Sequence, residues 1–215
     1  MSALRARGIR AAYDGRVVAA AESIEAAPGG IVALVGPNGC GKSTLLRLLA
    51  LLEPPVAGSV AILGEEVPPE GAERERMRLS VTLALPQPWL FSGTALGNAE
   101  RGLAARGVPR AERRERALRA LADLGAADLA DRDAKRLSTG ESARVALARA
   151  LAIETAVLLL DEPFAHLDPA GVPAARAAIE RRVAAGAAVV VAVVDPVDLH
   201  GLAARTIAVQ RPTSG

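Results

Sequence analysis

The feature that most constrains this chain is the glycine-rich segment GPNGCGKST at residues 36–44. It follows the β-branched run Ile31–Val35 and precedes the apolar run Leu45–Leu52. Its spacing matches G-x-x-x-x-G-K-[ST], and the context predicts a buried strand, a tight loop and a helix. Glycines let successive amides turn inward, and the helix directs its positive end to the same place. We therefore expect a phosphate-binding loop in an α/β sheet.

The loop supplies candidate residues for binding a nucleotide and its metal ion. Lys42 is expected to neutralise the β and γ phosphates, while the Ser43 hydroxyl holds Mg²⁺. Cys40 fits a slot for a small residue, and a redox role for its thiol stays open. The candidate nucleotide-binding residues of this loop are Gly36, Pro37, Asn38, Gly39, Cys40, Gly41, Lys42, Ser43 and Thr44.

A second chemical element is VLLLDE at residues 157–162, an apolar strand that ends in two acids. Ligands of open α/β sheets bind beyond the carboxyl ends of the strands, so both acids would face the phosphates. Asp161 is expected to hold Mg²⁺ through water, and Glu162 to orient or deprotonate the water that attacks the γ phosphate. Acids after a strand also arise as ordinary helix caps, and this reading stays open.

Composition narrows the class of protein. The chain has 215 residues, which suits one domain with a small additional lobe. Its apolar runs are shorter than the ~20 residues of a membrane helix, and its start lacks the apolar core of a secretory signal. One cysteine allows no intramolecular disulfide, and the net charge of +2 does not indicate nucleic-acid binding. We expect a cytoplasmic protein.

Other segments suggest the remaining layers of the fold. Residues 94–129 are charge-rich with a helical pattern, and in residues 110–123 we expect Leu118 and Leu121 on one face. Continuous apolar runs are typical of parallel strands that helices cover on both faces. Strands are expected at residues 4–18, 23–27 and 58–63 in a smaller β layer, and at 157–160 and 187–194 in the main sheet.

The order of motifs resembles the ATP-binding cassette (ABC) family across essentially the whole chain. It runs from GPNGCGKST through Gln87 in LPQPWLF and LSTGES followed by ARVALARAL to LLLDEPFAHLD. By this resemblance, LSTGE at residues 137–141 is the signature segment and opens a helix over residues 142–151. The resemblance implies a P-loop NTPase core with a parallel-type sheet, an antiparallel β subdomain and a small helical lobe. Residues 1–215 would form one ABC ATPase domain, with the core at 1–86 and 153–215 and the lobe at 87–152.

The resemblance also implies how the site works. Two cassettes, as a homodimer or a mixed pair, would sandwich two ATP molecules, so that Ser138 and Gly140 of one chain meet the γ phosphate bound by the other. Gln87 is similar to the residue that contacts Mg²⁺ and the attacking water. Tyr13 stands where the family has an aromatic that stacks on adenine, with a half-buried strand residue as the open alternative. Asp168 would lie along the dimer seam.

Two departures from the family pattern bear on activity. Thr139 replaces a glycine, which would be strained only if that residue needs a positive φ; we expect no such need. Val194 stands where the family has a histidine that contacts the γ phosphate, and neither His166 nor His200 has the spacing to replace it. Slow hydrolysis follows, and a non-hydrolytic module that dimerises on ATP is the alternative function.

The partner is suggested by the region around Gln87. Trp89, Leu90 and Phe91 would receive a helix of a membrane permease, or else seat the helical lobe on the sheet. The sequence of this stretch is similar to that of importer cassettes for tungstate or molybdate. This resemblance implies that the chain lies peripherally on the inner face of the cell membrane and is linked only indirectly to a solute-binding protein. A cassette that drives conformational work without transport is a further alternative.

Overall fold

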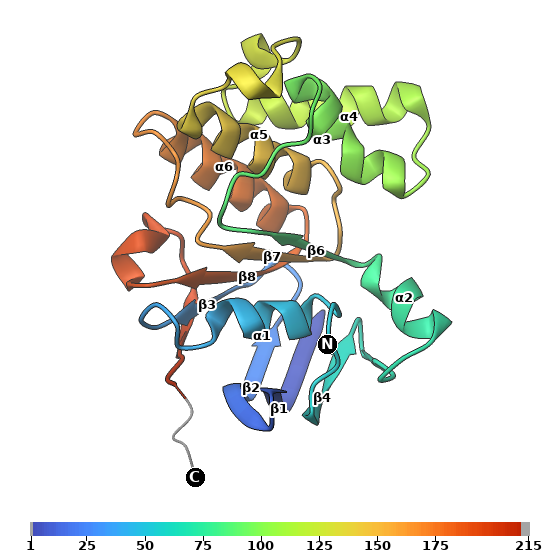
Figure 1. Ribbon diagram of the computed structural model, residues 1–215, viewed down its shortest axis with the longest axis vertical. Coiled ribbons are helices and arrows are strands. Elements are labelled where there is room, and N and C mark those ends of the chain that lie inside the picture. The colour runs from blue at the N-terminus through green and yellow to red at the C-terminus, as the bar shows by residue number, and fades with distance from the viewer. Residues whose placement is uncertain (1, 212–215) are drawn as a thin grey trace. The chain divides into compact units, whose positions relative to one another are not determined.

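The computed structural model of the chain describes residues 2–211 and divides into two compact units (Figure 1). The first unit comprises Met1–Leu83, Thr155–Glu162 and Val183–Gly215, and the second comprises Ala84–Glu154 and Pro163–Arg182. A compact unit is not by itself a folding domain, so the expected single domain over residues 1–215 stays a prediction.

An antiparallel sheet in the first unit has the strand order β2-β1-β4-β5. Its strands are β1 (Leu4–Tyr13), β2 (Arg16–Ala26), β4 (Ala57–Ile62) and β5 (Glu65–Glu66). Asp14 and Gly15 both have positive φ and join β1 to β2, because Tyr13 pairs directly with Arg16. Two such residues form the tight turn that suits a hairpin. The expectation of one strand over residues 4–18 was therefore wrong.

A second sheet in the same unit has the order β6-β7-β8-β3-β9. Its strands are β6 (Val81–Ala84), β7 (Val157–Asp161), β8 (Ala188–Val193), β3 (Ile31–Val35) and β9 (Arg205–Ala208). The pairs β7-β8, β8-β3 and β3-β9 are parallel, which confirms the expected α/β core. Every residue of β7 and β8 is buried. The carboxyl ends of β3 and β7 lie at one edge, on either side of β8.

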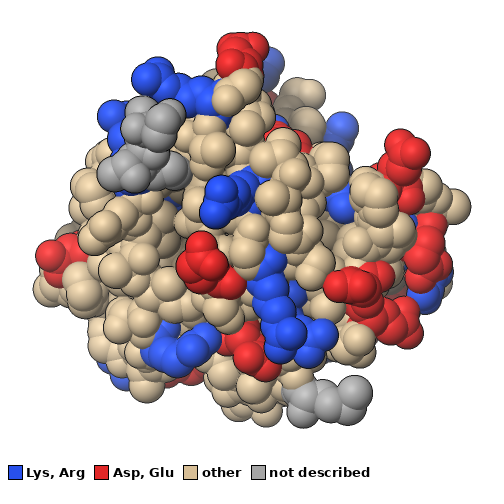
Figure 2. Space-filling view, turned by 90° about the horizontal axis from the view of Figure 1, so that it is seen from below, with Lys and Arg blue, Asp and Glu red and all other residues tan. Residues whose placement is uncertain are grey.

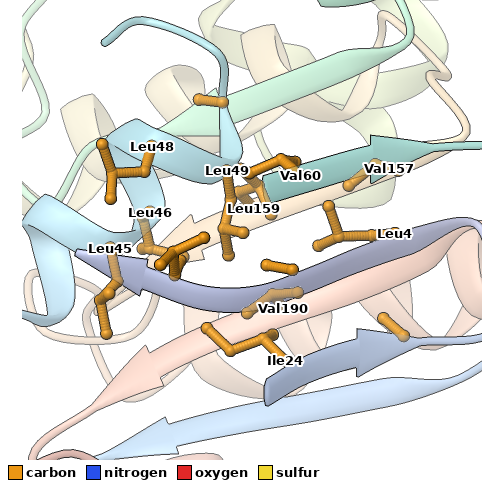
Figure 3. Close-up of a cluster of buried hydrophobic side chains, with 14 of the residues drawn as sticks. Leu4, Ile24, Leu45, Leu46, Leu48, Leu49, Val60, Val157, Leu159 and Val190 are labelled. Atoms are coloured by element: carbon orange, nitrogen blue, oxygen red, sulfur yellow. The ribbon is translucent and has the colours of Figure 1, made fainter. Parts of the chain in front are cut away.

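Helix α1 (Lys42–Leu49) joins the cores of the two sheets. Its four leucines are buried in a cluster that contains residues of both sheets (Figure 3). Burial of a leucine contributes about 1.5–3 kcal/mol, so this face anchors the helix firmly. The cluster residues labelled with them are Leu4, Ile24, Val60, Val157, Leu159 and Val190. The short helices α2 (Ala72–Arg78) and η3 (Pro196–Leu199) complete the unit.

The second unit is helical. It contains α3 (Ala95–Ala105), α4 (Arg110–Asp123), α5 (Thr139–Leu151), the turns η1 (Ala127–Leu129) and η2 (Ala134–Arg136), and most of α6 (Gly171–Ala184). In α4 the buried residues are Ala117, Ala120 and Leu121, whereas Leu118 is partly exposed. Leu118 and Leu121 therefore do not share the buried face, which Ala117 and Ala120 form together with Leu121.

Two surface properties concern possible partners. Within residues 2–211, no helix has both the length and the apolar character needed to cross a bilayer. On the face drawn in Figure 2, basic and acidic groups are interspersed among uncharged residues. That face therefore carries no extended field of one sign.

Candidate functional site

The phosphate-binding loop lies where β3 ends and α1 begins, as the motif predicts. Gly39 and Gly41 adopt positive φ, at 75° and 105°. A side chain at Gly36 would collide with the Val209 carbonyl oxygen and would lie 2.9 Å from the Cys40 sulfur. Cys40 is itself buried, so it fills space beneath the loop. The glycines are thus required by backbone conformation and by close packing.

The amino end of α1 is open to an anion. Gly41 is its N-cap and offers no side-chain hydrogen bond, and the first turn holds no acidic residue. The amides of the first helical turn have no partner within the helix, and the helix dipole adds partial positive charge there. An oxyanion above the loop would satisfy both.

Lys42 brings a full positive charge to the same end of the helix. Its side chain is buried, with 4% of the residue exposed. The ammonium Nζ donates to the carbonyl oxygens of Gly36 at 2.7 Å and of Pro37 at 3.2 Å. Both acceptors are uncharged, so the charge has hydrogen-bond partners but no counterion among them. A phosphate would supply that counterion.

A cavity of about 230 Å³ opens over the loop. It gathers most of the candidate nucleotide-binding residues of the first unit, together with one catalytic candidate. Gly36, Pro37 and Cys40 support the loop but do not line the cavity. The lining residues are Tyr13, Val18, Asn38, Gly39, Gly41, Lys42, Ser43, Thr44 and Glu162.

The two acids occupy different environments at the end of β7. Asp161 is 2% exposed, and its Oδ1 is buried without a hydrogen-bond partner. Burial raises the pKa of Asp161 above its usual value, against the opposing effect of a hydrogen bond with Ser43. Glu162 lines the cavity with φ of 46°, and its amide donates to the Ala192 carbonyl oxygen at 2.9 Å. The sequence pattern predicts Glu162 as a functional residue but does not predict this backbone conformation, which is unusual for a residue other than glycine.

The residues at this place fit a magnesium ion. An unpaired buried carboxylate oxygen beside a serine hydroxyl is a hard-oxygen ligand pair of the kind Mg²⁺ takes. No cluster of three or more His, Cys, Asp or Glu residues suited to a metal occurs in the described part of the chain. A magnesium ion here would therefore complete its shell with water and substrate phosphates, as this ion commonly does.

Tyr13 stands at the edge of the cavity with 47% of its surface exposed. Its hydroxyl donates to Glu53 Oε2 at 2.7 Å. The pKa of Tyr13 is raised chiefly by this hydrogen bond, and the pKa of Glu53 is lowered chiefly by the same bond. Sequence reasoning missed Glu53, because a contact between residues 40 positions apart leaves no local signal.

The signature segment lies in the second unit, at the start of α5. Ser138 is the N-cap, and a capping box joins its side chain and amide to Glu141. The helix therefore begins at Thr139, three residues before the expected start at Ser142. Thr139 is not among the residues with positive φ, so the expected mildness of this change is confirmed. Gly140 packs against Asp168, where an added Cβ would lie 3.2 Å from the aspartate Cβ.

Gln87 and the aromatic segment after it also belong to the second unit. Gln87 is exposed, and its carbonyl accepts from the Trp89 amide at 2.8 Å. Trp89 is 73% exposed and Phe91 50%, while Leu90 is partly buried. The Arg101 guanidinium carbon lies 3.9 Å from the centroid of the Phe91 ring. The segment thus presents aromatic surface beside positive charge.

The remaining candidates lie on the surface of their own units. Val194 directly follows β8 and is exposed. His200 caps η3 with φ of 48°, and His166 is exposed in the segment before α6. Each unit thus brings part of the expected site together: the phosphate loop, Tyr13 and the acids in the first, and Ser138, Gly140 and Asp168 in the second.

Comparison with known proteins agrees with this arrangement. The family model described as ABC transporter matches residues 21–165. A taurine import ATP-binding protein of Chromobacterium violaceum is 44% identical over 78% of this chain and 63% of its own. A probable anion import ATP-binding protein of Haloferax volcanii is 38% identical over 94% of this chain and 75% of its own.

Solved structures agree as well. A dimeric ATP-binding cassette in a post-hydrolysis state, bound to ADP and phosphate, has a TM-score of 0.85 and 25% identity, over 96% of this chain and 94% of its own.

A glycerol-3-phosphate import protein of Chromohalobacter salexigens matches over only 45% of its length, so this chain spans less than two thirds of that relative and of the taurine protein. The match of the family model to most of the chain nonetheless places the protein in the ABC transporter family.

Proposed function

We propose that this chain is the ATP-binding subunit of an ABC importer and that it hydrolyses Mg-ATP. The observation that carries the proposal is the single cavity over the phosphate loop, which gathers Tyr13, Lys42, Ser43 and Glu162. A buried ammonium, an open helix end and an acid at one cavity are the groups that phosphoryl transfer to water requires.

The proposed roles follow from position. Lys42 and the loop amides bind the phosphates, and Tyr13 contacts the adenine. Ser43 and Asp161 would hold Mg²⁺, with Gln87 as a further contact, and the ion would neutralise charge that develops on the phosphate oxygens. Glu162 orients the attacking water and accepts its proton, with Gln87 helping to orient the water. The buried Oδ1 of Asp161 supports its part, because no protein donor competes for it.

A complete site requires a second cassette. Ser138 and Gly140 lie at the amino end of α5, where backbone amides can bind an anion. We propose that they meet the γ phosphate held by a partner chain, in a homodimer or a mixed pair with ATP at the interface. The dimeric state of the solved cassette bound to ADP and phosphate supports this arrangement.

The membrane partner and cargo follow from the relatives. Curated relatives are named as importers of taurine, phosphate and an anion, and also of Fe³⁺ ions. We propose import of a small anion, specifically an oxyanion such as tungstate or molybdate, through a permease that contacts Trp89, Leu90 and Phe91. The chain would lie on the inner face of the cell membrane, with the solute-binding protein acting only through the permease.

The test is Mg-ATP turnover by the purified chain and by Glu162→Gln. Removing a general base costs about 10²–10⁴ in rate. We therefore expect turnover by Glu162→Gln to fall by about 100-fold or more, while ATP binding persists. Glu65→Gln, at an exposed residue of β5, is the matched control and should retain full turnover. Equal rates for the native chain and Glu162→Gln would refute hydrolysis by this site.

A non-hydrolytic dimerisation module is the second candidate. Two departures from the family pattern, at residues 139 and 194, favour this function. The first no longer does, because Thr139 has no positive φ and is unstrained. The other remains, because valine at position 194 cannot donate a hydrogen bond. This function would be favoured if native chain and Glu162→Gln were equally inert while both still dimerised on ATP.

A further inference from the structure

The carboxylate of Glu53 connects Tyr13, which lines the nucleotide cavity, to the helix that follows the phosphate loop. Glu53 Oε2 accepts from the Tyr13 hydroxyl at 2.7 Å, while Oε1 accepts from Arg47 Nε at 2.8 Å. A second nitrogen of the same guanidinium lies 2.6 Å from Oε1. Tyr13 ends strand β1, and Arg47 lies on α1, the helix that begins with Lys42. Glu53 therefore ties the aromatic residue to the helix of the phosphate loop.

The backbone of Glu53 is fixed as well. Arg74 Nη2 donates to the Glu53 carbonyl oxygen at 2.7 Å, and Arg74 Nη1 donates to the Pro68 carbonyl oxygen at 3.2 Å. Arg74 is buried, so these bonds are shielded from water and are stronger than surface ones. The backbone of Glu53 is thus held by Arg74, while its side chain reaches the half-exposed Tyr13.

This arrangement differs from the exposed ion pairs of the same unit. The side chain of Glu53 is 26% exposed, whereas that of Glu65, which pairs with Arg76, is 68% exposed. Exposed pairs contribute little, because solvent screens them and long side chains lose rotamer freedom. Glu53 instead accepts from two side chains on different elements, one of which lines the cavity.

We propose that Glu53 is a positioning residue that holds the Tyr13 ring in place for the base of the nucleotide. Without this bond, the Tyr13 side chain would have to be ordered when the nucleotide binds, and that entropy would be lost from the affinity. The inference rests on the proposed contact of Tyr13 with adenine. It makes no demand on hydrolysis, so its test is a binding measurement.

Isothermal titration of the full chain with Mg-ATP and with inorganic tripolyphosphate separates positioning from a structural role. Tripolyphosphate has no base, so only ATP can report on Tyr13. We expect Glu53→Ala to raise the Kd for ATP about three- to tenfold, the scale of one partly exposed hydrogen bond, and to leave the Kd for tripolyphosphate unchanged. Tyr13→Phe, which keeps the ring and loses the donor, should give a similar change.

Coupling provides the second readout. In a Tyr13→Ala background, Glu53→Ala should have no further effect on ATP affinity, because the two residues act as one unit. Glu65→Ala is the matched control and should change neither Kd. The proposal is overturned if Tyr13→Ala weakens ATP while Glu53→Ala does not, or if Glu53→Ala weakens both ligands equally. If neither variant affects ATP, the assignment of Tyr13 itself fails, and the inference fails with it.

Discussion

Replacing Gly41 with alanine tests how tightly the phosphate loop is built into the first unit. Gly41 has φ of 105°, which residues with a side chain rarely adopt. A Cβ there would lie 2.7 Å from the Ala19 Cβ and 2.9 Å from the Val18 carbonyl oxygen. Both atoms belong to β2, and Ala19 is fully buried, so neither can move without displacing the sheet.

Two costs combine in Gly41→Ala. The left-handed backbone costs about 1–3 kcal/mol for a residue other than glycine, and overpacking of a filled site costs about 1–3 kcal/mol. We therefore expect the free energy of unfolding to fall by about 2–6 kcal/mol. Gly186→Ala is the matched control, because Gly186 has φ of 92° and no atom within 4 Å of an added Cβ. It should lose only about 1–3 kcal/mol.

Urea denaturation followed by circular dichroism measures both variants. The difference between them isolates the overlap with β2 from the backbone strain, and an unchanged m value would show that the unfolded state is not responsible. Equal losses in Gly41→Ala and Gly186→Ala would refute the reasoning, since the loop would then have room to move away from the sheet.

Three other predictions concern single side chains. Burial raises the pKa of Asp161 in the folded chain, so the native chain loses stability as the pH rises through that raised pKa and the carboxyl group loses its proton. Asparagine does not titrate, so in thermal melts without nucleotide Asp161→Asn should gain stability relative to the native chain as the pH increases from about 4 to 8. A difference that stays constant with pH would contradict this. Ser138→Ala removes the capping box with Glu141 and should cost about 1 kcal/mol in urea denaturation, so an unchanged midpoint would count against the cap. Val194→His restores a hydrogen-bond donor and should raise Mg-ATP turnover at least about tenfold; an unchanged rate would show that position 194 does not act on the phosphates.

The parts of the fold that the sequence predicts correctly are those with strong local signals. The strand before the phosphate loop, the loop itself and the helix after it follow from one motif, and the buried strands β7 and β8 follow from continuous apolar runs. Helix α5 was expected to begin at Ser142, after the signature segment, although Thr139 and Gly140 are themselves only weak helix formers. The capping box outweighs that weakness and starts the helix three residues earlier.

Elements with weak or mixed patterns were not anticipated. The strand β6 has only four residues, and β9 is mostly exposed at the edge of its sheet, so neither forms a clear apolar run. In α2 the buried residues are Arg74 and Met77, and the arginine obscures the apolar face. In α6, alanines occupy buried and exposed positions alike, which hides the period of a helix.

The candidate site shows the same division between local and distant information. The phosphate loop and the acid pair occur as contiguous motifs, because backbone geometry and strand ends dictate their spacing. Glu53 has no motif, since its three partners come from β1, α1 and α2 and its own segment is an ordinary turn. Residues expected to contact the phosphates can therefore be found by pattern, whereas a residue that positions Tyr13 can be found only from the fold. If Glu53 acts as proposed, part of the affinity for ATP is set by contacts that no nucleotide-binding motif contains.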